Sequence, residues 1–314
     1  MSSTTANSSI EAGPKRRSFL VDVGVRLIRE KPLGTIGGVI VLILLITGIF
    51  ADFLAPFGMN EIHSDAFLSA PTSKYLLGAD NLGRDLLSRI IFGARISVIV
   101  GLCATTISVI VSTFIGIMTG YLGGKVDLVV QRMVDAWMCF PGLIIMMVLI
   151  TILGPGMWQV IIVLGLQYGI AGSRVVRGAV IGIKENVYVD AARAIGCSTP
   201  RILWQHILPN ILAPIIILFT TRMPAVILVE ASLSFLGFGI PPPAPSWGGM
   251  LSGAGRSYMF MAPWIAIWPG VALSIVVYGI NMFGDAIRDI VDPRLRGGVG
   301  RYGTAKSRAA AAEK

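Results

Sequence analysis

The residues whose types and spacing favour a defined interaction are concentrated in one polar stretch, residues 186–196, which lies between two apolar blocks. Ala191, Ala192 and Gly196 predict a short helix with a face of small residues, which would allow close approach to another protein. Asp190 falls near the first turn of that helix, where the helix dipole favours an acid. The stretch therefore predicts a docking helix, and an ordinary amphipathic helix within a loop is the alternative.

Metal and nucleophile chemistry has little support in this sequence. His63 and His206 are its two histidines, which is too few for a His-based zinc or nickel site. The three cysteines, Cys103, Cys139 and Cys197, are odd in number and far apart, so neither a disulfide framework nor a metal-type spacing is present. No catalytic residue is predicted, a membrane enzyme is disfavoured, and any metal would be cargo rather than a cofactor.

One glycine pair superficially resembles a phosphate-binding loop. Gly123 and Gly124 precede Lys125, but the first glycine of the motif is replaced by Thr119 and the hydroxyl residue after the lysine by Val126. The motif therefore fails. We expect no bound cofactor and no ATP site in this chain.

Charged residues inside apolar blocks are few, and an ion within a membrane is expensive enough to suggest a function. Arg222 is expected to pair with a partner subunit or to line an aqueous path. Glu230 is expected near the outer end of its helix, where it would snorkel, form a pair or touch cargo. Trp247 follows the helix-breaking prolines 241–243, and we expect it to anchor at the lipid headgroups or to line an external mouth.

The composition is that of a membrane protein. The chain has 314 residues, of which 54% are hydrophobic and 14% charged, whereas a soluble domain carries about a quarter charged residues. Its formal charge of +9 does not indicate a nucleic-acid partner, because the basic residues lie between apolar blocks rather than on one basic face. Retention of Lys and Arg on the cytoplasmic side of a membrane explains the charge better.

Six apolar blocks are long enough, or nearly so, to cross a bilayer as helices. They cover residues 33–53, 96–121, 136–153, 157–171, 211–230 and 263–283. The first is too long for a signal-peptide core and is interpreted as an uncleaved anchor. The fourth is short, so it must tilt little, thin the bilayer or extend to Gly172 and Ser173. The predicted fold class is an all-α membrane protein with about six transmembrane helices.

The distribution of basic residues predicts the orientation of these helices. The segments that we place inside carry twenty Lys and Arg residues, and those placed outside carry four, Lys74, Arg84, Arg89 and Arg256. Both termini are therefore expected in the cytoplasm. Residues 1–32 form a partly disordered N-terminal segment, 33–284 the transmembrane domain with a cytoplasmic loop at 184–209, and 285–314 a cytoplasmic tail.

The cytoplasmic loop resembles the EAA loop of ABC importer permeases, which forms the coupling helix that docks on the ATPase subunit. Asp190 replaces the glutamate of that motif, and His206 stands where a branched aliphatic residue is common. The residues at the family spacing, and hence the implied ATPase-coupling residues, are Asp190, Ala191, Ala192, Gly196, Leu208 and Pro209.

Three further stretches, residues 78–97, 234–249 and 284–296, are similar to the C-type subunit of dipeptide, oligopeptide and nickel importers. The resemblance covers about residues 33–298. It implies a permease in a bacterial or archaeal cell (inner) membrane that forms half of a pathway for peptides, a nickel chelate or glutathione. The implied partners are a second homologous permease, two cytoplasmic ABC ATPases that use ATP and Mg, and an extracytoplasmic binding protein.

A secondary transporter or channel that is not coupled to ATP is the main alternative. Secondary transporters usually place ionisable residues near the bilayer midplane, often on broken helices of paired repeats. This sequence offers Arg222 and little else there. The candidate contacts with the pathway or with a partner permease are Arg222, Glu230, Phe238 and Trp247.

Overall fold

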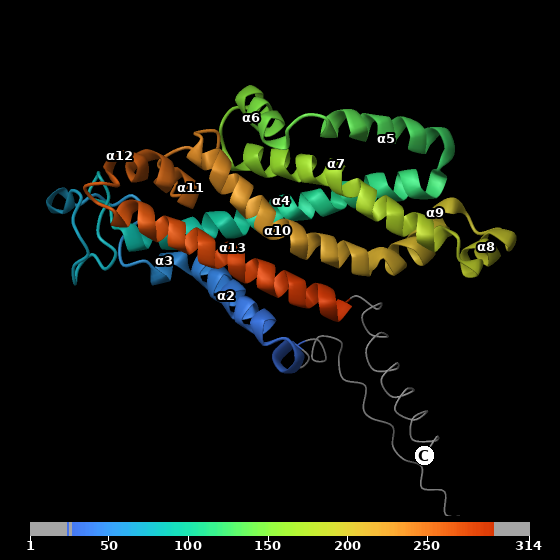
Figure 1. Cartoon of the computed structure of the whole chain (residues 1–314), viewed down its shortest axis with the longest axis horizontal. Helices are drawn as coiled ribbons and strands as arrows, with labels where there is room; N and C mark the ends of the chain where they lie inside the picture. The colour runs from blue at the N-terminus through green and yellow to red at the C-terminus, as the bar shows by residue number, and fades with distance from the viewer. Residues whose placement is uncertain (1–23, 25–26, 292–314) are drawn as a thin grey trace, which may run out of the picture.

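The computed structural model describes residue 24 and residues 27–291, and the regular elements in that part of the chain are helical. Five long helices run roughly side by side along the long axis of the molecule (Figure 1). They are α2 (Pro32–Ile49), α4 (Leu86–Leu122), α7 (Met157–Lys184), α10 (Leu212–Phe235) and α13 (Trp264–Val291). Each is long and apolar enough to cross a membrane, which confirms the predicted all-α membrane fold.

Shorter elements connect these helices. They are α3 (Ala51–Leu54), a 3₁₀ turn (Ser64–Ala66), α5 (Gly124–Met138), α6 (Gly142–Leu153), α8 (Val187–Ala194), α9 (Thr199–Ile202), a π turn (Leu203–Ile207), a 3₁₀ turn (Leu208–Ile211), α11 (Trp247–Met250), a second π turn (Leu251–Gly255) and α12 (Arg256–Tyr258). The loop after α3 lies at one end of the molecule together with α11 and α12, and α8 and α9 lie at the opposite end (Figure 1).

The third predicted span, residues 136–153, is not one straight helix. Helices α5 and α6 meet at a break over residues 139–141 and are bent by 89° relative to each other. Pro141 explains the break, because it lacks an amide proton and restricts the residue before it to extended conformations. If the bent pair is one span, the described residues contain six spans.

Other helices are longer than predicted. Helix α4 begins ten residues before the predicted start, because Asp85 caps its first turn by accepting a hydrogen bond from the Ser88 amide at 2.7 Å. Helix α7 continues to Lys184 instead of ending at residue 171, so Arg174 and Arg177 lie within a helix. Helix α13 continues to Val291, and the rest of the predicted tail lies outside the described residues, as does most of the N-terminal segment 1–32.

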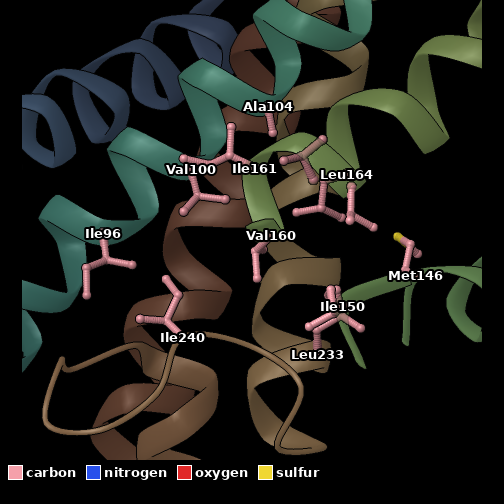
Figure 2. Packing of buried hydrophobic residues seen from close by; sticks show 12 residues of the cluster. Ile96, Val100, Ala104, Met146, Ile150, Val160, Ile161, Leu164, Leu233 and Ile240 are labelled. Carbon is pink, nitrogen blue, oxygen red and sulfur yellow. The ribbon is translucent and has the colours of Figure 1, made fainter. Parts of the chain in front are cut away.

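Helices α4 and α7 form the centre of the bundle. They approach closely because glycines of each helix lie against branched side chains of the other along their seam. A Cβ atom on Gly116 would lie 2.6 Å from the Cβ of Val176, and one on Gly165 would lie 2.5 Å from Ile107. At one end of the seam, side chains from α4, α6, α7 and α10 form an apolar cluster that includes Val100, Leu164 and Leu233 (Figure 2).

Candidate functional site

Helix α8 occupies the stretch in which the sequence predicts a docking helix. Asp190 lies in its first turn and accepts a hydrogen bond from Arg193 at 3.1 Å. Gly196 has a φ of +83°, which a side chain would strain, and its amide donates to the Arg193 carbonyl at 3.0 Å. The glycine therefore ends the helix by the expected turn, and a Cβ there would meet open space.

Ala192 does not lie on the exposed face of α8, contrary to the prediction. It is buried with Val189 against Val176 and Val180 of α7. Ala191 is exposed instead. The cause is helical periodicity, which turns residues 189 and 192 to one side and residue 191 away from it. Of the three small residues, Ala191 and Gly196 are exposed, while Ala192 supports the helix from within.

Tyr121, at the end of α4, ties α8 to the long helices. Its carbonyl accepts a hydrogen bond from Lys184 Nζ at 2.6 Å, and the Arg193 guanidinium lies 5.2 Å from its ring centroid. Its contacts with Tyr121, and then with Asp190, raise the pKa of Arg193, so that side chain stays charged. Helix α8 is thus held to α4 through Tyr121, in addition to its apolar packing on α7.

Apolar side chains that sequence reasoning missed surround α8. Val187 and Ile195 are more than 80% exposed, and Trp204 on the following π turn is 73% exposed. The presence of large apolar residues within a polar loop was the sequence signal that could have identified this surface. Leu208 is half-buried and Pro209 exposed at the start of the turn that leads into α10, so both lie near the base of this surface. We call Val187, Ala191, Ile195 and Trp204 the α8 surface.

A cavity of about 450 Å³ lies at the opposite end, between the loop before α4 and the turn after α10. Asp80, Arg84 and Arg89 contribute charged groups to its lining. Asp80 is buried and accepts hydrogen bonds from the amides of Leu82 at 2.8 Å and Arg84 at 3.0 Å, and from Arg84 Nε at 2.7 Å.

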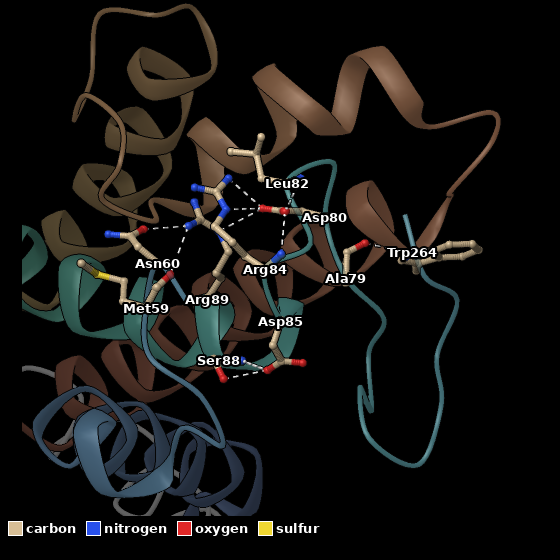
Figure 3. A network of polar contacts seen from close by, with 10 residues as sticks. All are labelled: Met59, Asn60, Ala79, Asp80, Leu82, Arg84, Asp85, Ser88, Arg89 and Trp264. Carbon is tan, nitrogen blue, oxygen red and sulfur yellow. Dashed lines mark hydrogen bonds and ion pairs between the residues drawn. The ribbon is translucent and has the colours of Figure 1, made fainter. Parts of the chain in front are cut away.

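Figure 3 shows the contacts by which the Asp80 carboxylate holds its loop in place. Arg89 Nε lies 3.6 Å from Asp80 Oδ2, and Arg89 Nη1 donates to the Met59 carbonyl and to Asn60 at 3.3 Å. Each charge of the network has an opposite partner, as buried charges require. The network fixes the loop after α3 to the first turn of α4.

Trp247 neither anchors at the surface nor lines a mouth, and both predictions for it are wrong. The side chain is 2% exposed, and its indole nitrogen donates to the Ile90 carbonyl of α4 at 3.1 Å. Gly93 makes room for the ring, because a Cβ there would lie 2.7 Å from it. The proline-rich turn folds back over α4 and carries Trp247 into the interior.

The other candidate pathway residues are enclosed to different degrees. Glu230 is 1% exposed and accepts a hydrogen bond from Ser234 Oγ at 2.7 Å, so it does not snorkel and is not available to cargo in this conformation. Phe238 is half-buried against the apolar cluster of Figure 2. Arg222 is half-buried and stacks over the Tyr168 ring of α7, with 5.4 Å between guanidinium carbon and ring centroid.

The described residues contain no group of three or more His, Cys, Asp or Glu side chains that could hold a metal ion. The α8 surface lies at one end of the molecule and the polar cavity at the other.

Comparison with family models gives two matches. Residues 112–297 match the binding-protein-dependent transport system inner membrane component, and residues 18–71 match the N-terminal transmembrane domain of oligopeptide transport permease C. The first match includes α8 and covers more than half of the chain.

Curated relatives match over most of their length. A glutathione transport system permease protein of Pectobacterium atrosepticum is 37% identical over 82% of this chain and 86% of its own. A dipeptide transport system permease protein of Alkalihalophilus pseudofirmus is 36% identical over 86% of this chain and 88% of its own. A putative peptide transport system permease protein of Brucella suis is 38% identical over 89% of this chain and 94% of its own.

A chain of the inward-facing MetNI methionine ABC transporter is similar in structure. It matches with a TM-score of 0.50 and 21% sequence identity, over 66% of this chain and 96% of its own length. At this identity, the likeness shows a shared fold.

Proposed function

This chain belongs to the family of binding-protein-dependent transport system inner membrane components, and on that premise we propose that it forms half of the translocation pathway of an ATP-driven importer for peptides or glutathione. It is a multi-pass permease subunit of the ABC importer type. The α8 surface is the single observation that carries the coupling to ATP, because it exposes large apolar groups on a short helix fixed firmly to the bundle.

We propose that a cytoplasmic ATPase subunit covers the α8 surface. Val187, Ile195 and Trp204 offer apolar contact area, and Ala191 leaves room for a close approach. ATP and Mg would be used by two such subunits and not by this chain. The ATPase would act through α8 because the helix is joined to α4 and α7 at Tyr121.

A second, homologous permease would complete the pathway. Helix α6 and the bend before it support this proposal, since they leave large apolar side chains exposed, among them Phe140 and Ile144. An extracytoplasmic binding protein would deliver the solute, and the name of the family, which describes transport as dependent on a binding protein, supports this proposal. The relatives are named for dipeptides, peptides and glutathione, so a nickel chelate is the less supported cargo.

The proposed orientation places α8 in the cytoplasm and the cavity beside Asp80 outside, in a bacterial or archaeal inner membrane. Arg174, Arg177, Lys184, Arg193 and Arg201 all lie toward the α8 end, which favours the cytoplasm for that end. The N-terminal run 15–17 and the tail beyond residue 291 would lie on the same side, and both fall outside the described residues.

The test is uptake into proteoliposomes that contain the purified complex of this chain, its partner permease and its ATPases, with the binding protein added. Labelled dipeptide should accumulate when ATP is hydrolysed and should not when a non-hydrolysable analogue replaces ATP. Uptake that is independent of ATP would favour the secondary transporter and remove the importer assignment.

Ala191→Trp tests the docking surface in the same assay. Ala191 is exposed, so the permease should still insert with the bulky side chain, while the ATPase subunits no longer co-purify and uptake is lost. Ala191→Ser keeps a small side chain and should behave as the parent. Normal uptake by Ala191→Trp would contradict the coupling role of α8.

A further inference from the structure

Helix α5 is weakly packed against the rest of the chain. Among its fifteen residues, Val134 alone is buried, whereas ten residues of α7 are. Both ends of α5 are breaks in the helical path. It follows Gly123 and Gly124, which have φ values of +66° and +54°, and it ends at the 89° bend over residues 139–141. The helix therefore has little apolar contact to hold it and a turn on each side.

Polar groups attach α5 to α7. Asp127 of α5 accepts two hydrogen bonds from Arg177 of α7, from Nε at 2.6 Å and from Nη2 at 2.5 Å. Asp135, further along α5, pairs with Arg174 of α7. The side chains of these pairs are between 19% and 42% exposed. Ion pairs with this much access to solvent can be exchanged for water at small cost, unlike an apolar seam.

An open depression of about 410 Å³ lies along the seam between the two helices. It is lined mostly by charged residues that include the four members of the two ion pairs, and by Gln131. The Gln131 Nε2 atom is buried and has no hydrogen-bond partner within the described part of the chain. A buried donor without a hydrogen-bond partner destabilises this conformation of α5. A conformation that gives the Gln131 amide a partner would remove that cost.

The start of α5 lies next to the point at which α8 is fastened. Tyr121 precedes Gly123 by two residues, and it contacts both Lys184 and Arg193. A displacement of α8 would therefore act on Tyr121 and then on the glycine pair that begins α5. The physical connection between the two elements runs through the cation–π contact of Arg193 with Tyr121 and the two-residue step from Tyr121 to Gly123, while the hydrogen bond from Lys184 holds the end of α7 to the same tyrosine.

We propose that α5 is a hinged arm of the permease, held on α7 by the Asp127–Arg177 and Asp135–Arg174 pairs in one state of the transport cycle and released from α7 in another. The arm turns at Gly123 and Gly124 and at the bend over residues 139–141. The inference rests on the proposed importer function, since displacement of α8 by the ATPase supplies the driving force. The four charged residues are positioning residues, which act on the arm and not on the cargo.

Charge reversal and charge exchange in the full complex test the arm. Asp127→Arg places two guanidiniums together and should lower ATP-driven uptake by about tenfold while the ATPases still turn over. Arg177→Asp should do the same, and the double variant Asp127→Arg/Arg177→Asp, which restores the pair with exchanged signs, should recover most of the uptake. Lys125→Asp is the matched control, because it changes the charge of α5 by as much at an exposed position away from the seam.

The reaction rate of a thiol placed at the seam is a second measurement. If the ion pairs had a purely structural role, this rate would not depend on the nucleotide state. In a complex without Cys103, Cys139 and Cys197, Gln131→Cys should react with a hydrophilic maleimide at rates that differ by about fivefold or more between the nucleotide-free and the ATP–vanadate-trapped states. Adding Asp127→Arg should make the fast rate independent of nucleotide.

Two results would overturn the arm. One is full uptake by Asp127→Arg, and the other is an equal reaction rate of Gln131→Cys in both nucleotide states. If the parent complex itself shows no ATP-driven uptake, the proposed importer function fails, and that outcome is separate because it is measured before any variant.

Discussion

Trp247 shows how an amphipathic residue can be used for internal packing. Its ring fills the space that Gly93 leaves on α4, and its indole proton is satisfied by the Ile90 carbonyl. Burial of an aromatic ring with a satisfied donor stabilises a fold more than an exposed ring does. At the scale of the residue, the proline-rich turn after α10 is therefore held in place by one side chain.

Trp247→Ala is expected to lower the free energy of unfolding by about 3 to 5 kcal/mol, because it leaves a cavity beside Gly93 and removes the hydrogen bond from the indole to the Ile90 carbonyl. The measurement is the thermal melting of the purified permease in detergent. Trp158→Ala is the control, since that side chain is 61% exposed and its removal should change the melting temperature little. Equal losses for the two variants would indicate that Trp247 is no better packed than a surface tryptophan.

At the scale of elements, the loop between α3 and α4 depends on a polar network rather than on an apolar core. Its small apolar cluster contains Ala66, Tyr75 and Ala79, so most of the order must come from hydrogen bonds to Asp80. Two arginines share this carboxylate, and one of them extends to Met59 and Asn60. Removing the carboxylate would leave both guanidiniums without their anion.

Asp80→Ala is therefore expected to cost about 3 kcal/mol and to release the loop after α3. Limited proteolysis of the purified permease should cut between residues 55 and 85 faster than in the parent. Asp65→Ala is the matched control, because Asp65 pairs with Lys74 at 3.5 Å on the open surface of the same loop and should contribute little. Equal cutting of the two variants would contradict the assignment of the network as the fastening of this loop.

At the scale of the whole molecule, the α8 surface and the loop after α3 lie at opposite ends of the bundle (Figure 1). The long helices between them are apolar, so a bilayer would separate these ends. The proposed importer needs α8 on the side of the ATPases and the polar cavity on the side of the binding protein. The orientation of the chain is therefore part of the mechanism.

Cysteine labelling in intact cells tests this orientation independently of family membership. In a background without Cys103, Cys139 and Cys197, Ser73→Cys should react with a membrane-impermeant thiol reagent, and Ser198→Cys should react after permeabilisation only. Both positions are exposed, so access is decided by the membrane and not by the fold. If the two sites exchanged their behaviour, α8 would face away from any cytoplasmic ATPase.

Features that depend on neighbouring residues could be predicted from the sequence. The length of apolar runs gives the all-α membrane class, and the small residues followed by Gly196 give α8 and its terminating turn. The break between α5 and α6 also had a local signal in Pro141, which the continuous apolar run from residue 136 concealed. These features are local because backbone conformation and membrane insertion respond to short segments.

Features that depend on distant partners were decided by the tertiary structure alone. Arg174 and Arg177 lie beyond the predicted end of the fourth span at residue 171, yet they are helical and their charges are met by Asp135 and Asp127 of α5. Trp247 is buried because Gly93, more than 150 residues earlier, leaves space for it. Polarity along the chain records that a residue needs a partner, and the packing of the helices determines which partner it receives.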